Sequence, residues 1–182
     1  MIDLNNAEPA FALIPAGTIA EAIVSLQPGN HGENKLFTKS EKTGSIGLKV
    51  CFTLTSGSYA KRKIFQLIGF QGSKKDETGK DTWGAMGQTL IRSLVESAKG
   101  IYPSDKSVES IEKRKIKLTE LHNMKCIVKI GIETDKSAKH PDKNKIFTAI
   151  TPDHSDYSKF KTVTSTRSNI EEDSDFNDKI PF

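Results

Sequence analysis

The chain has 182 residues and a formal net charge of +4; 35% of its residues are hydrophobic and 27% are charged. This length allows one domain with an appendage, and the apolar share is below the roughly 45–50% of ordinary globular domains. No apolar run reaches the ~18 residues of a membrane span, and the N-terminus lacks the features of a secretory signal. Two cysteines are too few for a disulfide scaffold, so we expect a cytoplasmic protein in a reducing compartment.

Charge is divided unevenly along the chain. Residues 169–182 contain five acids and one base, a net charge of −4, which leaves the rest of the chain at +8. A basic body with an acidic tail favours a polyanionic partner for the body, although a solvated tail without a role is the simpler alternative.

Hydrophobic residues alternate with polar ones in three segments of the N-terminal half. Residues 16–26 follow Pro15 and predict a strand, and 27–44 form a long polar loop. Residues 46–55 predict a second strand, and 59–70 predict its return partner in a hairpin. The return strand places Ile64 and Ile68 on one face and the bases with Phe65 on the other. One side of this hairpin is therefore expected to be apolar and the other basic and aromatic.

A helix is predicted to start after a cap at residue 81 or 82 and to run to about residue 99. Asp81 or Thr82 can cap its start, an apolar stripe runs from Trp83 to Ala98, and Gly100 stands where a glycine cap ends a helix. Residues 107–121 fit either a short charged helix or an irregular excursion.

The C-terminal third predicts two more strands and then a tail. Residues 125–133 and 145–151 alternate as strands do, with a lysine-bearing loop between them. Three strands, a helix and two strands follow the order of an oligonucleotide/oligosaccharide-binding barrel (OB-fold), so the predicted fold is mainly β. We expect residues 1–151 to form this nucleic-acid-binding domain and 152–182 to be a disordered tail with an acidic tip.

The last residues combine acids with an apolar end. Pro181 holds the end extended, and Phe182 offers a ring and a carboxylate that can dock together on a partner protein. This ending resembles the acidic tip of bacterial single-stranded DNA-binding proteins, which recruits replication, repair and recombination enzymes. Lys179 departs from the aspartates usual at its position. The residues that the resemblance assigns to protein interaction are Asp173, Asp175, Asp178, Ile180, Pro181 and Phe182.

The body is similar to phage-encoded single-stranded DNA-binding proteins rather than to the bacterial ones. The resemblance rests on short motifs that span most of residues 15–151. They are Pro15-Ala16-Gly17-Thr18, the run from Gly57 through Tyr59 and Arg62 to Ile64-Phe65, Trp83 leading the helix, and Gly100-Ile101. This resemblance implies a protein of the bacterial cytoplasm, either a cellular or a phage-encoded one.

Binding of single strands requires cations along the phosphates and aromatic rings on which bases stack. The hairpin supplies both, and the loops at residues 27–44 and 134–144 supply more lysines. Alternatively, Phe65 belongs to the core and Tyr59 is only a residue of the hairpin turn. The candidate DNA-binding residues are Phe37, Lys49, Tyr59, Lys61, Arg62, Lys63, Phe65, Lys136, Lys139, Lys143 and Lys145.

Catalytic and metal-binding motifs do not match the sequence. The glycines between residues 72 and 80 have the wrong spacing for a phosphate loop, and His122 and Cys126 lack a second pair of zinc ligands. We therefore predict no catalytic residue, metal or cofactor. Sequence-independent binding and protection of single-stranded DNA is the favoured function. An RNA-binding module, a nuclease or recombination accessory protein, and a pure interaction protein stay open, as do weaker duplex binding and homo-oligomerisation.

Overall fold

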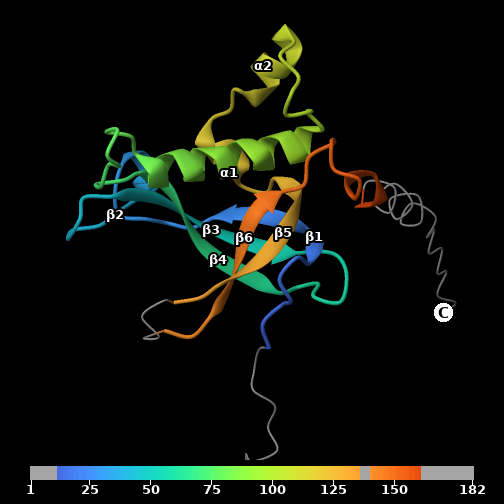
Figure 1. Ribbon diagram of the computed structural model, residues 1–182, viewed down its shortest axis with the longest axis horizontal. Helices are drawn as coiled ribbons and strands as arrows, with labels where there is room; N and C mark the ends of the chain where they lie inside the picture. Colours follow the sequence, from blue (N-terminus) through green and yellow to red (C-terminus); the bar gives the residue numbers. More distant parts are fainter. Residues whose placement is uncertain (1–11, 136–139, 161–182) are drawn as a thin grey trace, which may run out of the picture.

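The computed structural model describes residues 12–135 and 140–160. They form a mainly β structure in which a curled antiparallel sheet is covered by a helix (Figure 1). The strands are β1 (Ile19–Leu26), β2 (Thr38–Lys39), β3 (Ile46–Leu54), β4 (Lys63–Gln71), β5 (Lys125–Glu133) and β6 (Lys143–Ala149). The helices are α1 (Thr82–Lys99) and α2 (Val108–Arg114), with 3-10 turns η1 (Glu33–Lys35) and η2 (Leu118–Leu121).

Strand β3 is the centre of the sheet. It pairs with β4 from Ile46 to Thr53, so β1 and β2 must share its other edge, β1 near Leu54 and β2 near Ile46. The sheet then continues from β1 to β5 and β6, all antiparallel. Five strands were expected, and the sixth is the short β2, which lies within the predicted loop.

The free edges of β4 and β6 meet through one side chain. The amide nitrogen of Gln66 donates to the carbonyl of Ile146 at 3.2 Å, and the backbone N–H of Ile146 donates to the Gln66 amide oxygen at 2.8 Å. No backbone ladder joins the two strands in the described part of the chain. The sheet is therefore open at this β4–β6 junction, and a closed five-stranded barrel is not established.

The predicted alternation of the hairpin strands is confirmed. The inward side chains of β3 fill the core with residues from β1, α1, β5 and β6, and Phe52 is completely buried. On β4, Ile64 and Ile68 are buried, whereas Phe65 is 64% exposed and Leu67 is 47% exposed. The return strand begins at Lys63 rather than residue 59, because residues 55–62 form a wider turn in which Lys61 has a φ of 70°.

Helix α1 forms as predicted and lies against β4, β5 and β6 (Figure 1). The Asp81 side chain accepts from the Gly84 N–H at 2.8 Å, and Gly100 ends the helix with a φ of 67°. The helix and β4 approach closely at Gly87, where a Cβ would overlap the Gly69 carbonyl. The first turns of the predicted stripe are less buried than expected, since Met86 is 65% exposed.

Residues 107–121 form α2 and η2, on the side of α1 away from the sheet (Figure 1). Packing also continues past residue 151, where Tyr157 is buried and its hydroxyl donates to the Ser97 carbonyl at 2.8 Å. Both cysteines are free and buried, and burial raises the pKa of the Cys126 thiol to about 12. None of the described helices has the length and apolarity of a membrane span.

Candidate nucleic-acid interface

The outward side chains of the central hairpin form a surface that we name the β3–β4 face. It consists of Lys49, Lys63, Phe65 and Leu67, all of them exposed. The strand register places Lys49 opposite Leu67 and Cys51 opposite Phe65, so these side chains lie on the same side of the pleat. The sheet thereby presents an aromatic ring and a leucine with ammonium groups beside them.

Two hollows flank Phe65. One, of about 440 Å³, is lined by Gln27, Pro28, Lys49 and Leu67 together with the ring. The other, of about 820 Å³, lies between the start of β4 and the start of β6. It is lined by Leu13, Ala60, Lys61, Arg62, Lys63, Ile64, Phe65, Asp142, Lys143 and Asn144. The ring therefore stands between two recesses with mostly basic charges around them.

Three of the lysines at the hollows beside Phe65 have no partner among the residues that the structure describes. In residues 12–135 and 140–160, the ammonium groups of Lys49, Lys61 and Lys63 take part in no hydrogen bond or ion pair. An ammonium group in this setting attracts solvent ions, which a polyanion releases when it binds. These three predicted residues are thus brought together with Phe65.

Three other predicted residues have different surroundings. The guanidinium of Arg62 donates to the Ala12 carbonyl at 2.8 Å. Tyr59 is partly buried against the core. Phe37 is also partly buried, and its ring centroid lies 4.7 Å from that of Phe70, at the opposite end of the hairpin from Lys61. The structure does not group these rings with Phe65.

The predicted lysines of β6 share an acidic partner on β5. Glu133 lies 3.0 Å from the Lys143 ammonium group and 3.1 Å from that of Lys145. Hydrogen bonds from Lys143 and then Lys145 lower the pKa of this carboxyl below its usual value. Lys136 and Lys139 lie outside the described residues, as do Asp173, Asp175, Asp178, Ile180, Pro181 and Phe182 of the tip.

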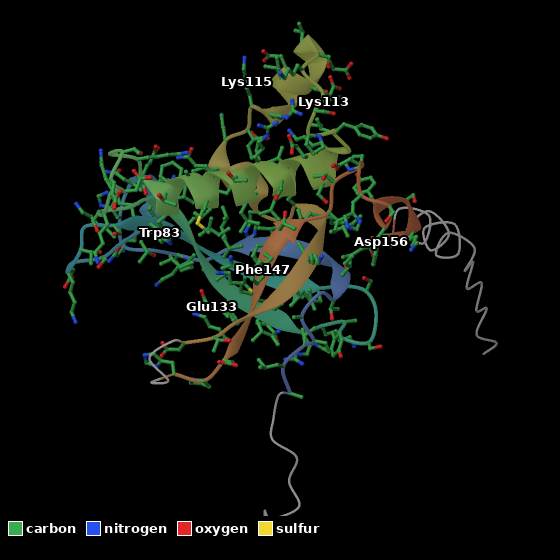
Figure 2. All side chains as sticks on the ribbon, in the orientation of Figure 1. Trp83, Lys113, Lys115, Glu133, Phe147 and Asp156 are labelled. Atoms are coloured by element: carbon green, nitrogen blue, oxygen red, sulfur yellow. The ribbon has the colours of Figure 1, made fainter. Side chains whose placement is uncertain are left out.

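Sequence reasoning missed an aromatic residue on β6. Phe147 is 59% exposed, and the Lys145 ammonium group lies 5.5 Å from its ring centroid; Figure 2 shows where Phe147 and Glu133 lie. A signal was present in the alternation of the predicted strand, because Phe147 stands next to the inward-facing Ile146. Its exposure on the last strand could have been predicted in this way.

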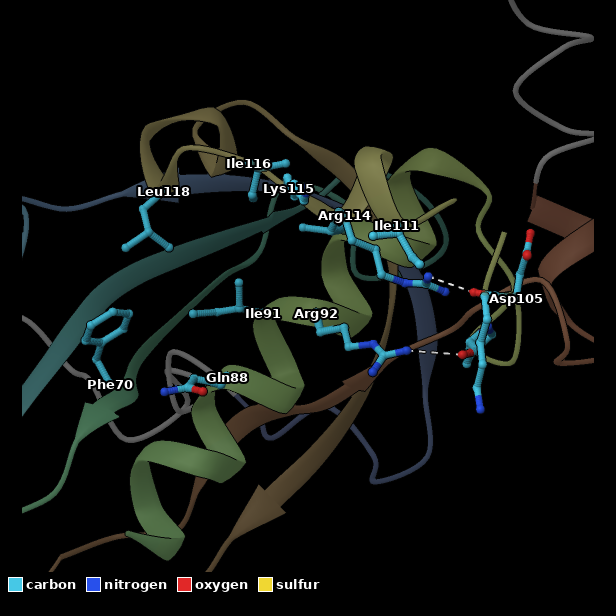
Figure 3. Close-up of a pocket in the computed structure, with 13 residues that line it drawn as sticks. Phe70, Gln88, Ile91, Arg92, Asp105, Ile111, Arg114, Lys115, Ile116 and Leu118 are labelled. Carbon is cyan, nitrogen blue, oxygen red and sulfur yellow. Dashed lines mark hydrogen bonds between the residues drawn. The ribbon is translucent and has the colours of Figure 1, made fainter. Parts of the chain in front are cut away.

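A further pocket lies between α1 and the segment that carries α2. Its volume is about 600 Å³, and Figure 3 shows Ile91, Ile111 and Leu118 lining it beside several basic residues. The two arginines at this pocket have a shared partner: Arg92 and Arg114 each donate to the buried Glu96 carboxylate, at 2.8 and 2.7 Å. They also donate to backbone carbonyls, so their charge supports the local fold.

No group of three or more potential metal-ligating His, Cys, Asp or Glu residues occurs in the described ranges. Comparisons with known proteins add no relative: no protein-family model matches the chain, and no curated protein matches it.

Proposed function

We propose that the protein binds single-stranded DNA without reading its sequence, and that it protects the strand during replication, recombination and repair. The single observation that carries the proposal is Phe65, an exposed ring between two hollows that also include three lysines without a partner in the described part of the chain. A base stacks on such a ring whatever its identity, with about 1–3 kcal/mol per base, while lysines release counterions from the phosphates.

The sheet supports an OB-type assignment. In that fold, the second and third strands carry the ligand, and the two major strands of this hairpin, β3 and β4, correspond to them. We propose that the Gln66 amide closes the barrel at the β4–β6 junction, where its two hydrogen bonds replace a backbone ladder. The basic start of β6 would then lie beside the ligand-binding hairpin.

The proposal includes a second activity for the tail. The acids that precede Ile180-Pro181-Phe182 recruit partner enzymes together with these residues, because an aromatic ring beside acidic side chains fits an apolar pocket with a basic rim. Residues 169–182, with a net charge of −4, also compete with DNA for the rest of the chain, which carries +8. Tethering gives this segment a high effective concentration.

The first test is fluorescence anisotropy of a labelled single strand of about 30 nucleotides, long enough for one site of this class. We expect tight binding that falls steeply with salt, that differs little between base compositions, and that duplex DNA competes for poorly. Absence of binding at low salt would overturn the proposal. Stronger competition by matched RNA would replace it with RNA binding, and magnesium-dependent loss of the label would replace it with a nuclease.

The second test removes residues 169–182. Affinity for the single strand at low salt should increase, and capture of partner enzymes should disappear. Removal of Phe182 alone should leave DNA binding unchanged and still abolish capture. Equal low-salt affinity of the full chain and the truncated chain would refute the competition, and capture without Phe182 would refute the docking.

A further inference from the structure

The exposed ring of Phe147 rests on a glycine of the neighbouring strand. A Cβ added to Gly131 of β5 would overlap the ring, so the absence of a side chain there lets the ring lie against the strand. The residue is nevertheless 59% exposed. An aromatic ring supported by backbone and open to solvent is the arrangement that a stacking base requires, and burial in the core does not explain it.

A hollow beside the ring leaves room for such a base. It has a volume of about 500 Å³ and is lined by Phe147 and Thr148 of β6 with Met86 and Leu90 of α1. Met86 is itself 65% exposed. The recess therefore offers apolar side chains beside the ring, together with the polar side chains of Asp76, Lys80, Thr82 and Thr89.

Two lysines of β6, one of them next to Phe147, are held by one carboxylate. Glu133 pairs with Lys143 at 3.0 Å and with Lys145 at 3.1 Å, and the Lys145 ammonium group is 5.5 Å from the Phe147 ring centroid. The side chain of Glu133 is 42% exposed, so an incoming anion can reach the pair. A carboxylate bound by two ammonium groups has the charge and the hydrogen-bonding pattern of a phosphate oxygen pair in the same place.

We propose that Phe147, Lys143 and Lys145 form a second nucleotide subsite, in which Glu133 occupies the position of a phosphate until a single strand displaces it. The base stacks on Phe147, and the phosphate takes over both lysines. This inference rests on the proposed function, because it assigns a further part of the same strand's path.

The subsite is continuous with the β3–β4 face. Lys143 lines the same hollow as Lys63 and Phe65. The hydrogen bonds between Gln66 and Ile146 bring the residue after Phe65 next to the residue before Phe147. A strand that stacks on Phe65 therefore has a path across the β4–β6 junction to Phe147.

Substitution of the ring tests the stacking. Phe147→Ala should weaken binding of a single strand of about 30 nucleotides by about tenfold, as the loss of one stacked base implies. Phe147→Leu keeps an apolar contact on Gly131 and should weaken binding similarly, which separates stacking from folding. Tyr102→Ala is the matched control: its ring is 53% exposed near the end of α1, and affinity should not change.

Phe147→Trp provides a direct readout. Its fluorescence should be quenched by the bound strand beyond any quenching of Trp83, the one tryptophan of the wild-type chain. Glu133→Gln should increase affinity at low salt, because the lysines are then free, whereas Glu112→Gln on α2 should not.

The outcomes separate the subsite from the proposed function. If the wild-type chain and Phe65→Ala behave as the proposed function requires, but Phe147→Leu and Phe147→Trp show neither loss nor quenching, the subsite is refuted and the function stands. Weaker binding by Glu133→Gln would refute the displacement of Glu133. If the wild-type chain binds no single strand, both proposals are refuted.

Discussion

Two basic regions of this molecule differ in what neutralises their charge. In the α1–α2 region, Arg92 and Arg114 bind Glu96, Lys99 donates to the Lys113 carbonyl at 2.7 Å, and Lys115 pairs with a glutamate of α2. On the hairpin side, Lys49, Lys61 and Lys63 have no partner in the described part of the chain.

The difference separates structural charge from binding charge. A cation held by a buried carboxylate such as Glu96 gains little from a phosphate, because binding must first break the existing buried pair. A cation without a partner keeps its full attraction for a polyanion. Composition alone counts all these residues equally, so the net charge of the body does not reveal which surface would bind DNA.

The largest effect is expected for Glu96→Gln. The change leaves Arg114, whose side chain is only 16% exposed, without its acid, and removal of one partner from a buried pair costs about 3 kcal/mol of unfolding free energy. Urea unfolding should show this loss, while the folded variant binds DNA as before. The control is Glu112→Gln, which removes an exposed pair and should cost less than about 1 kcal/mol. Equal losses in both variants would contradict the structural role of Glu96.

Phe65→Ala should have the next largest effect. Loss of the stacking ring should weaken single-strand binding by about tenfold, with the salt dependence unchanged because no charge is removed. Anisotropy titrations at several salt concentrations measure both quantities, and Tyr102→Ala serves as the exposed aromatic control. An unchanged affinity would show that the β3–β4 face is not the stacking surface.

A smaller effect is expected for Lys63→Gln. The slope of log affinity against log salt should decrease by about 0.7, the value for one phosphate contact with a single strand. Lys115→Gln, in which the lost lysine was already paired with Glu112, should leave the slope unchanged. If both substitutions change the slope equally, partnered and unpartnered lysines do not differ in the way the comparison requires.

The smallest effect is a pH dependence confined to the α1–α2 region. Hydrogen bonds from the Ser110 hydroxyl and then from Ser107 lower the pKa of Asp105 to about 2. Because the folded-state pKa is depressed, this carboxylate stabilises the folded state above the unfolded value near 3.8, and the contribution is lost as the pH falls through about 2. Protection of the Ser107 backbone amide against hydrogen exchange should decrease as the pH falls over this range. Asp105→Asn should remove the dependence, and its persistence would exclude Asp105 as the cause.

Local pattern predicted much of the fold correctly. The period-two alternation of β3 and β4 identified the inward Ile64 and the outward Phe65, because a strand sends successive side chains to opposite faces. The glycine at residue 100 correctly marked the end of α1, and Asp81, one of the two predicted caps, is the residue that caps its start. Both kinds of signal depend only on neighbouring residues.

Features that depend on distant pairing were less accessible. The two-residue strand β2 exists because Thr38 pairs with Gly47, and so short a segment has no period of its own. The bridge from Gln66 to Ile146 joins residues 80 positions apart, and an amide at residue 66 has no local signature of that contact.

The sequence by itself determined the alternating strands, the capped helix and the separation of a basic body from an acidic end, because these follow from local backbone preferences and composition. Only the tertiary structure decided which cations are free. It pairs Arg114 with Glu96 and Lys145 with Glu133, and it exposes Phe147 beside Lys145. Within the described residues it leaves Lys49, Lys61 and Lys63 without a partner. The physical reason is that an ion pair or an exposed ring is defined by distances across the fold.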